Sequence, residues 1–307
     1  MIYTCTLNPS IDYIMHVNEF EAGGLNRAQD TSYYPGGKGI NVSRVMSRLD
    51  VQTQAIGYIG GFTGAFVQQF LDSESIQHDF IDTKQHTRIN VKLKSNEETE
   101  INGPGSEISE QLQQELLRKI KRLSNKDTLV LAGSLPSSLP ADFYVQMSTI
   151  CAENDTKVVA DTSGSALEQL LGHPLFLLKP NHHELGDLFN VTIDSRKKAA
   201  FYGRKLIDQG VKHVIVSMGG EGAVYIGHRK ELYANVPKGE VKNSVGAGDS
   251  VVSGFLAALE KDEPIEDAFR YGVASGSATA FQDDLCKKED VEHLLSQIDV
   301  SAINEKE

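Results

Sequence analysis

The segment Gly246-Ala-Gly-Asp249 places a carboxylate directly after two glycines, and apolar residues with helical spacing follow as far as residue 259. This pattern predicts a glycine loop that enters a helix, where free N–H groups and the helix dipole favour an anion and should keep Asp249 ionised. Such a site suits phosphoryl transfer, with Asp249 as the base for an acceptor hydroxyl and Gly246, Ala247 and Gly248 around the transferring group. A simpler interpretation is that Asp249 only caps the helix, but that gives the glycines no necessary role.

A second glycine loop, Gly36-Gly-Lys-Gly39, precedes a helix predicted over 41–49. Its backbone could approach an anion closely, and Lys38 would add a full positive charge. A glycine-rich turn before a helix is also common for steric reasons alone. The loop does not satisfy the Walker pattern G-x-x-x-x-G-K-[ST], and the H-R-D and D-F-G motifs are missing from the sequence.

Alternating strand and helix patterns would position these loops. Short β-branched runs predict strands over 1–7, 128–132, 156–160, 175–179, 213–217 and 223–227. Helical patterns between many of them, as over 110–123, 197–209 and 264–281, indicate an α/β fold with a mostly parallel sheet. Ligands bind beyond the carboxyl ends of such strands, where Ser134, Asp161, Lys179, Asn181 and Ser217 fall, although turn residues of these types follow strands in any case.

Two regions, 10–36 and 87–103, break this alternation. In the second, a period of two puts Arg88, Asn90 and Lys92 on one face of a strand and apolar residues on the other. We expect these regions to form a small β-sheet that acts as a lid over the core formed by 1–9, 37–86 and 104–307. An ordinary solvated hairpin is the alternative.

Charge and cysteine content exclude several classes of protein. The formal net charge of −12 argues against binding to nucleic acid or to an anionic membrane surface. Cys5, Cys151 and Cys286 are too widely spaced for a disulfide framework or a zinc site, so we expect reduced thiols. The N-terminus has no signal-peptide pattern, and no run is long and apolar enough to span a membrane, so we expect a cytoplasmic protein.

Four segments, in the same order along the chain, carry a family resemblance: Thr6-Leu-Asn-Pro-Ser-Ile-Asp12, Gly36-Gly-Lys-Gly-Ile-Asn-Val-Ser43, Lys179-Pro-Asn-His-His-Glu184 and Asn243-Ser-Val-Gly-Ala-Gly-Asp249. Together they resemble the signatures of the PfkB-type (ribokinase-like) carbohydrate kinases. The resemblance implies a three-layer α/β/α sandwich with a small β-sheet lid. The Asn8-Pro-x-x-Asp12 start, Lys38 inside the glycine loop and Val245 before Gly246 resemble the branch of the family that includes 1-phosphofructokinases and tagatose-6-phosphate kinases.

The resemblance also implies a role for each matching residue. For the sugar phosphate it implies Asp12, Gly37, Lys38, Asn41, Arg88, Asn90, Lys92, Asn102, Gly103 and Ser134. For ATP it implies Lys179, Asn181, Glu184, Ser217, Gly219, Gly222, Gly246 and Gly248. Glu184 would hold Mg²⁺ through water. The net charge is consistent with a role for Arg88 and Lys92, because a dianionic substrate in a protein of net charge −12 needs local cations.

In function, the resemblance implies transfer of the ATP γ-phosphate to fructose 1-phosphate. Tagatose 6-phosphate is the alternative substrate, and it would be anchored at its opposite end. A non-catalytic sugar-phosphate sensor is a further alternative, although its expected sign, loss of Asp249 or of the glycine pair, is not found. The resemblance also suggests a homodimer that pairs through the lid.

Overall fold

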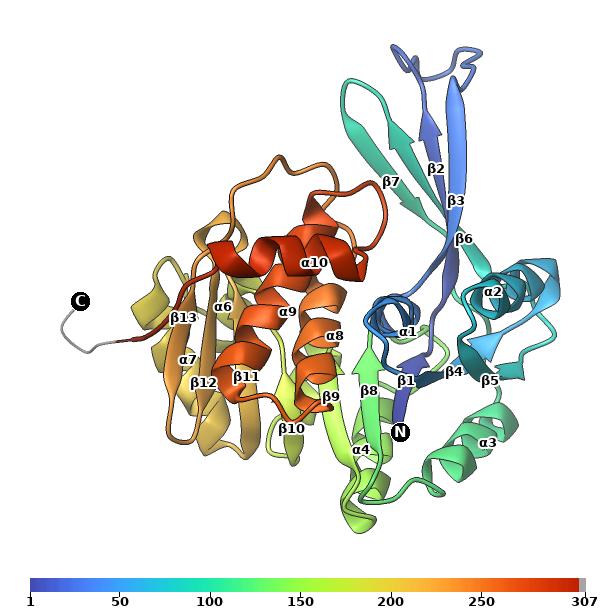
Figure 1. Ribbon diagram of the computed structural model, residues 1–307. Helices are drawn as coiled ribbons and strands as arrows, with labels where there is room; N and C mark the ends of the chain where they lie inside the picture. Colours follow the sequence, from blue (N-terminus) through green and yellow to red (C-terminus); the bar gives the residue numbers. More distant parts are fainter. Residues whose placement is uncertain (304–307) are drawn as a thin grey trace.

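Two sheets organise the computed structural model, which describes residues 1–303. The strands of the larger sheet are β1 (Ile2–Thr6), β4 (Thr53–Ile59), β5 (Gln77–Asp82), β8 (Thr128–Ala132), β9 (Lys157–Asp161), β10 (Leu175–Leu178), β11 (Val211–Ser217), β12 (Ala223–Gly227), β13 (Glu231–Ala234) and β14 (Val300–Ala302). They are ordered β14-β13-β12-β11-β10-β9-β8-β1-β4-β5 (Figure 1). Neighbours from β5 to β11 are parallel, and β12 to β14 add an antiparallel edge.

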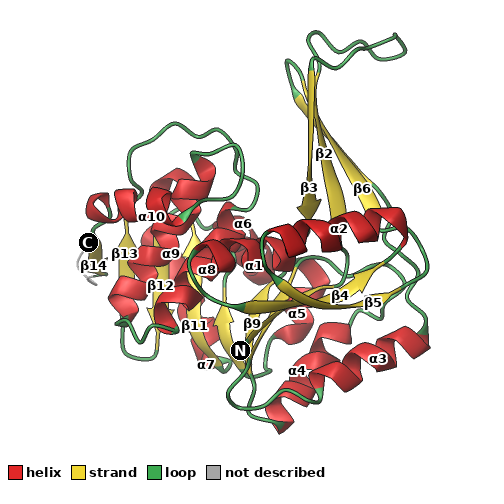
Figure 2. Ribbon diagram, turned by 45° about the vertical axis from the view of Figure 1, so that its right-hand side comes forward, coloured by secondary structure: helices red, strands yellow, loops and turns green. Residues whose placement is uncertain are grey.

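Helices cover both faces of the large sheet (Figure 2). One face packs against α1 (Lys38–Arg48), α8 (Ala247–Leu259), α9 (Ile265–Ala280) and α10 (Lys288–Leu294), with α2 (Gly61–Ser73) beside α1. The other face packs against α3 (Glu110–Ile120), α4 (Phe143–Glu153), α5 (Gly164–Leu170), α6 (His182–Phe189) and α7 (Arg196–Asp208). The predicted three-layer α/β/α sandwich is therefore confirmed.

The small sheet stands above the carboxyl ends of the large one (Figure 1). Its strands, in the order β3-β2-β6-β7, are β2 (Ser10–His16), β3 (Asp30–Gly36), β6 (Arg88–Lys94) and β7 (Glu98–Asn102). Residues paired directly across strands share a face, so Asp12 and Asn90 lie on one face, and Tyr13 and Val91 lie on the other. The four strands fall within the two regions, 10–36 and 87–103, that break the strand–helix alternation.

Chain order reverses at β1, which pairs with β4 on one side and β8 on the other. In parallel sheets such a reversal opens a crevice at the carboxyl ends of the strands. The glycine loop after β3 enters α1 at this point. All six predicted strands are present, whereas β4, β5, β13 and β14 of the large sheet were not predicted.

The three cysteines are buried and free, as expected. Within residues 1–303, the helices include none that is both long and apolar enough to span a membrane.

Candidate active site

A cavity of about 520 Å³ lies at the carboxyl ends of the central strands, between the two glycine loops and the small sheet. Most of the predicted site residues line it: Asp12, Gly37, Lys38, Asn41, Arg88, Asn90, Ser134, Lys179, Asn181, Glu184, Ser217, Gly246, Gly248 and Asp249. Its volume is in the range of small-molecule sites. Residues from seven separate parts of the chain therefore meet in one place.

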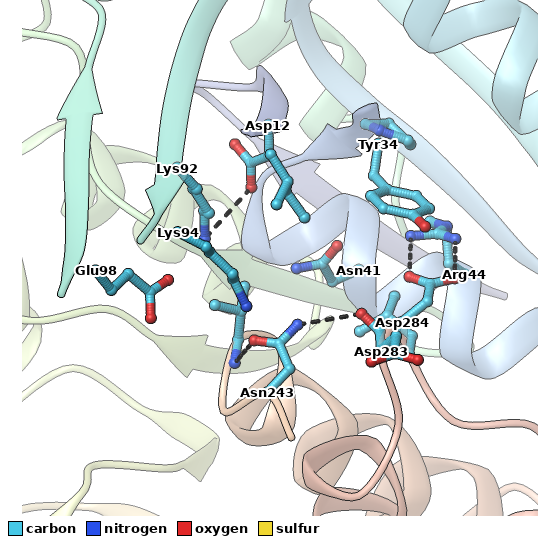
Figure 3. Close-up of a pocket in the computed structure, with 14 residues that line it drawn as sticks. Asp12, Tyr34, Asn41, Arg44, Lys92, Lys94, Glu98, Asn243, Asp283 and Asp284 are labelled. Carbon is cyan, nitrogen blue, oxygen red and sulfur yellow. Dashed lines mark hydrogen bonds and ion pairs between the residues drawn. The ribbon is translucent and has the colours of Figure 1, made fainter. Parts of the chain in front are cut away.

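The remaining predicted residues lie outside this cavity. Lys92 lines an adjoining narrow pocket with Asp12 and Asn41 (Figure 3). The Gly103 carbonyl accepts a hydrogen bond from Arg88, next to the exposed Asn102. The other three residues, Ala247, Gly219 and Gly222, lie in turns or helices. The Ala247 N–H donates to the Ser244 carbonyl (3.3 Å). A Cβ on Gly222 would come 2.1 Å from the Ala234 carbonyl oxygen.

Asp249 lies inside the first turn of α8 and is 4% exposed. The N-cap of this helix is Gly246, at φ 78°, so the interpretation of Asp249 as the helix cap is wrong. The positive φ favours glycine, and a Cβ on Gly246 would also come 2.5 Å from Leu285 Cδ2. Asn41 Nδ2 donates to Asp249 Oδ2 over 2.9 Å and so fixes the carboxylate between the two glycine loops.

The pKa of Asp249 differs from expectation. Burial, together with the nearby negative charge of Asp161, raises it to about 7, although Lys38, Lys179 and the Asn41 hydrogen bond act in the opposite direction. The helix N-terminus was expected to keep the group ionised, but desolvation outweighs that effect because it disfavours the charged form. A carboxylate that titrates near neutral pH is well matched to accept a proton from a hydroxyl.

Asp161, at the end of β9, is fully buried and holds two of the predicted lysines. Its Oδ1 lies 3.0 Å from Lys38 Nζ and 3.4 Å from Lys179 Nζ. Burial alone would raise the pKa of Asp161, but Lys179 and Lys38 outweigh it and the pKa is lowered. Lys38 and Lys179 thus form one cluster beside Asp249, and a Cβ on Gly248 would come 3.1 Å from Lys179 Nζ.

The first glycine loop is packed tightly against the end of β1. Gly37 is the N-cap of α1 at φ 124°, and a Cβ there would come 2.6 Å from Thr6 Cγ2. Sterics and positive φ therefore both require glycine at this position. The same geometry directs the start of α1 toward the cavity, so Lys38 and Asn41 reach Asp161 and Asp249.

The polar face of the small sheet turns toward the cavity. Asn90 Nδ2 donates to Asp12 Oδ1 (3.0 Å), and Lys92 Nζ lies 3.9 Å from Asp12 Oδ2. Arg88 donates to the carbonyls of Asn8 (3.1 Å) and Gly103 (3.3 Å), while its buried Nε has no hydrogen-bond partner within residues 1–303. Burial lowers the pKa of Arg88, so an anion placed beside it would restore favourable charge pairing.

Asn181 and Glu184 form a capping box at the start of α6. Asn181 Oδ1 accepts from the Glu184 N–H (2.9 Å), and Glu184 Oε2 accepts from the Asn181 N–H (2.8 Å). The spacing of these two residues therefore has a local structural role. Both still line the cavity, beside Ser217, which pairs with Asn181 across an isolated bridge.

Some residues of the site were not predicted. Asp161 was noted only as a strand end, whereas Thr6, Asn8 and Ser10 lay within a recognised motif without an assigned role. The position of Asp161 after a buried parallel strand was the available signal. Asp161 contacts Lys179 and also Lys38, which lies more than a hundred residues away in the sequence. Local sequence patterns could not reveal these contacts.

Most of the chain matches one known protein family. The model of the pfkB family of carbohydrate kinases matches residues 6–292. The chain belongs to this family. The predicted family and its ribokinase-like fold are thereby confirmed, and the family name supports a kinase over a sensor.

Relatives of the chain match along its whole length. A 1-phosphofructokinase of Bacillus subtilis (strain 168) is 51% identical, covering 99% of this chain and 100% of that protein. A D-tagatose-1-phosphate kinase of Bacillus licheniformis is 36% identical, covering 98% and 99%. Phosphofructokinase-2 of Escherichia coli, solved with substrates and products, is 28% identical with a TM-score of 0.92, covering 96% and 98%; it is also known in a tetrameric inhibited form.

Proposed function

We propose that this protein transfers the γ-phosphoryl group of ATP to the C6 hydroxyl of fructose 1-phosphate, giving fructose 1,6-bisphosphate and ADP. The observation that carries the proposal is the buried Asp249, held by Asn41 in a cavity that also contains Arg88. It joins a base with a pKa near 7 to a cation suited to a phosphate group. The full-length relative named 1-phosphofructokinase, 51% identical, supports this choice of acceptor.

Asp249 acts as the base in this reaction. Its carboxylate accepts the proton of the C6 hydroxyl, and Asn41 keeps the carboxylate in place. The amides around Gly246, Ala247 and Gly248 stabilise the charge of the transferring group, although the Ala247 N–H is already engaged by a carbonyl. Lys38 and Lys179, gathered by Asp161, add positive charge on the same side.

The small sheet supplies the cations for the phosphate that the substrate already carries. Arg88 lines the cavity with a planar guanidinium that can bind two phosphate oxygens, and Lys92 lines the adjoining narrow pocket. Asp12 and Asn90 lie between the two and suit the sugar hydroxyls. In this arrangement the sheet serves as a lid whose polar face covers the substrate, with Gly37, Ser134, Asn102 and Gly103 around its edge.

ATP and Mg²⁺ are assigned to the α6 side of the cavity. Lys179, Asn181, Glu184 and Ser217 line it there, and Gly219 and Gly222 form the turn after β11. No group of three His, Cys, Asp or Glu side chains within residues 1–303 could hold a metal alone, which fits Mg²⁺ because this ion keeps water and phosphate oxygens as ligands. Glu184 would hold it through water, and when bound it would neutralise charge on the nucleotide phosphates.

We also propose that two copies pair through the outer face of the small sheet. Tyr33, Ile89 and Ile101 on this sheet are 56%, 41% and 60% exposed. Exposed apolar side chains gathered on one sheet face are typical of an interaction surface. The tetrameric form of the E. coli relative supports self-association in the family without identifying this surface.

A substrate panel tests the proposed reaction. The protein is assayed with ATP and fructose 1-phosphate, fructose 6-phosphate, tagatose 1-phosphate or tagatose 6-phosphate, and both ADP and the bisphosphate are measured. We expect the highest kcat/KM with fructose 1-phosphate, followed by tagatose 1-phosphate, because both carry their phosphate at C1. A higher kcat/KM with either 6-phosphate would contradict the assignment, as would binding without ADP formation.

A further inference from the structure

Arg44 is a buried cation that lies beside the proposed site but has no part in the chemistry assigned above. It follows Asn41 by three residues on α1, and its side chain is 2% exposed. Its guanidinium lies 4.8 Å from the ring centroid of Phe70 on α2 and 5.9 Å from that of Tyr34 on β3. A charge this deeply buried is stable only if it is paired.

Two carboxylates pair with Arg44, and a second arginine completes the cluster. Arg44 forks onto Glu74, at the end of α2 (3.0 and 3.2 Å), and onto Asp284, in the segment after α9 (2.8 and 3.2 Å), as drawn in part in Figure 3. Arg48 Nη2 lies 2.8 Å from Glu74 Oε1 and 2.9 Å from Asp284 Oδ2. Two positive and two negative side chains thus connect α1 to α2 and to the 281–287 segment.

The 281–287 segment in turn supports the 243–248 loop, which carries Gly246. The Leu285 side chain lies against Gly246, where a Cβ would come 2.5 Å from Leu285 Cδ2. Asn243 Nδ2 donates to the Asp283 carbonyl (3.3 Å), in contact with the same segment. Arg48 donates to the Leu285 carbonyl, so the cluster holds a residue that packs closely on Gly246.

We propose that Arg44 and Asp284 are positioning residues that, through Leu285, hold the 243–248 loop in the geometry needed for phosphoryl transfer. This inference rests on the proposed function, because it gives the 243–248 loop its role in the reaction. Bidentate pairs restrict the positions of both partners more than a single contact does. Small displacements of groups that stabilise a transition state reduce the rate far more than they reduce ground-state binding.

Asp284→Asn tests the proposal, with Glu74→Gln as a matched control. Each variant removes one carboxylate from the same two arginines, but only Asp284 belongs to the segment that touches the loop. We expect Asp284→Asn to lower kcat about 10- to 100-fold while the KM values for ATP and the sugar phosphate change less than about threefold. Glu74→Gln should leave kcat within about threefold of the wild type.

Two further measurements separate positioning from folding and from the choice of substrate. Leu285→Ala leaves the four charges in place and should reproduce the loss of kcat if contact with Gly246 transmits the effect. Hydrogen exchange of residues 243–249, measured without substrate, should be faster in Asp284→Asn than in Glu74→Gln. This readout stands even if the substrate panel identifies another sugar phosphate.

Equal kcat losses in Asp284→Asn and Glu74→Gln would overturn the proposal, since the cluster would then act only through overall stability. Unchanged exchange in the 243–249 region of Asp284→Asn would overturn it as well. A wild-type protein that does not phosphorylate any sugar phosphate would instead refute the proposed function.

Discussion

Asp249 carries the proposed proton transfer, so its carboxylate is the first group to change. Asp249→Asn keeps the size of the side chain and removes the ability to accept a proton. We expect kcat to fall about 100- to 10,000-fold, which is the usual contribution of a positioned base. Calorimetric titration with fructose 1-phosphate should give an affinity close to that of the wild type. Near-normal turnover in this variant would remove Asp249 from the role of base.

The pKa of Asp249 also sets a pH dependence. Because burial and Asp161 raise it to about 7, the base becomes protonated, and therefore inactive, as the pH falls through neutrality. We expect the plot of kcat/KM against pH to lose activity on its acid side with an apparent pKa near 7. An acid limb with an apparent pKa near the ordinary value for Asp would show that the pKa of the substrate-free carboxylate is not raised in this way.

Asp161 and Lys38 should move that acid limb in opposite directions. Asp161→Asn removes a negative charge near Asp249, lowers the pKa of the base and shifts the limb to lower pH. Lys38→Met removes a positive charge and shifts it to higher pH. Both profiles are measured with saturating ATP, and Lys84→Met, at an exposed lysine that does not line the cavity, serves as the control. Shifts of the same sign in both variants would contradict the electrostatic account.

At the residue scale, sequence motifs predicted the side chains that are proposed to act on ligands and missed those that contact other side chains. Asp249, Lys38 and Asn41 lie in short motifs whose glycines and helical spacing can be recognised from the sequence alone. Asp161 and Arg44 function through partners far away in the chain, such as Lys38 and Asp284. Their pairing, and the burial that raises the pKa of Asp249, exist only after the chain has folded.

At the scale of elements, strand β6 provides the proposed grip on the substrate phosphate. Arg88→Ala removes a partly buried guanidinium that lines the cavity, whereas the proposed ATP side of the site is built from other strands. A charged hydrogen-bonding group contributes about 1.5–3 kcal/mol, so KM for the sugar phosphate should rise about 10- to 100-fold. KM for ATP should change less than about threefold. Equal effects on both KM values in steady-state assays would contradict the lid assignment.

Element prediction succeeded where a period was clear. The alternation of Arg88, Asn90 and Lys92 predicted a two-faced strand, and β6 has that form. Strands β4 and β5 were missed because Thr53-Gln-Ala-Ile-Gly-Tyr-Ile59 and the polar run from Gln77 lack a clear alternation. The pairing of β4 with β1, and of β5 with β4, decides their structure. Strand β14 of the antiparallel edge also depends on a partner distant in sequence, because it pairs with β13 (Leu232 with Ala302).

For the whole molecule, a net charge of −12 and a site that binds two anionic ligands require positive charge to be local. The fold achieves this by gathering cations from three places: α1, the end of β10 and the small sheet. The same sheet has an opposite face with a row of apolar residues. Catalysis and self-association would then depend on the two faces of one element.

Dimerisation through that apolar face is testable with a single charge. Ile101→Asp places a carboxylate on the small sheet at a position that is 60% exposed, and burying it in an interface would be costly. We expect the dissociation constant of the dimer to rise at least about tenfold, as measured by sedimentation velocity over a range of concentrations. Phe201→Asp is the matched control, because Phe201 on α7 is also 60% exposed and lies on the large sheet's helical layer. A wild-type monomer, or equal dissociation of both variants, would rule out pairing through this face.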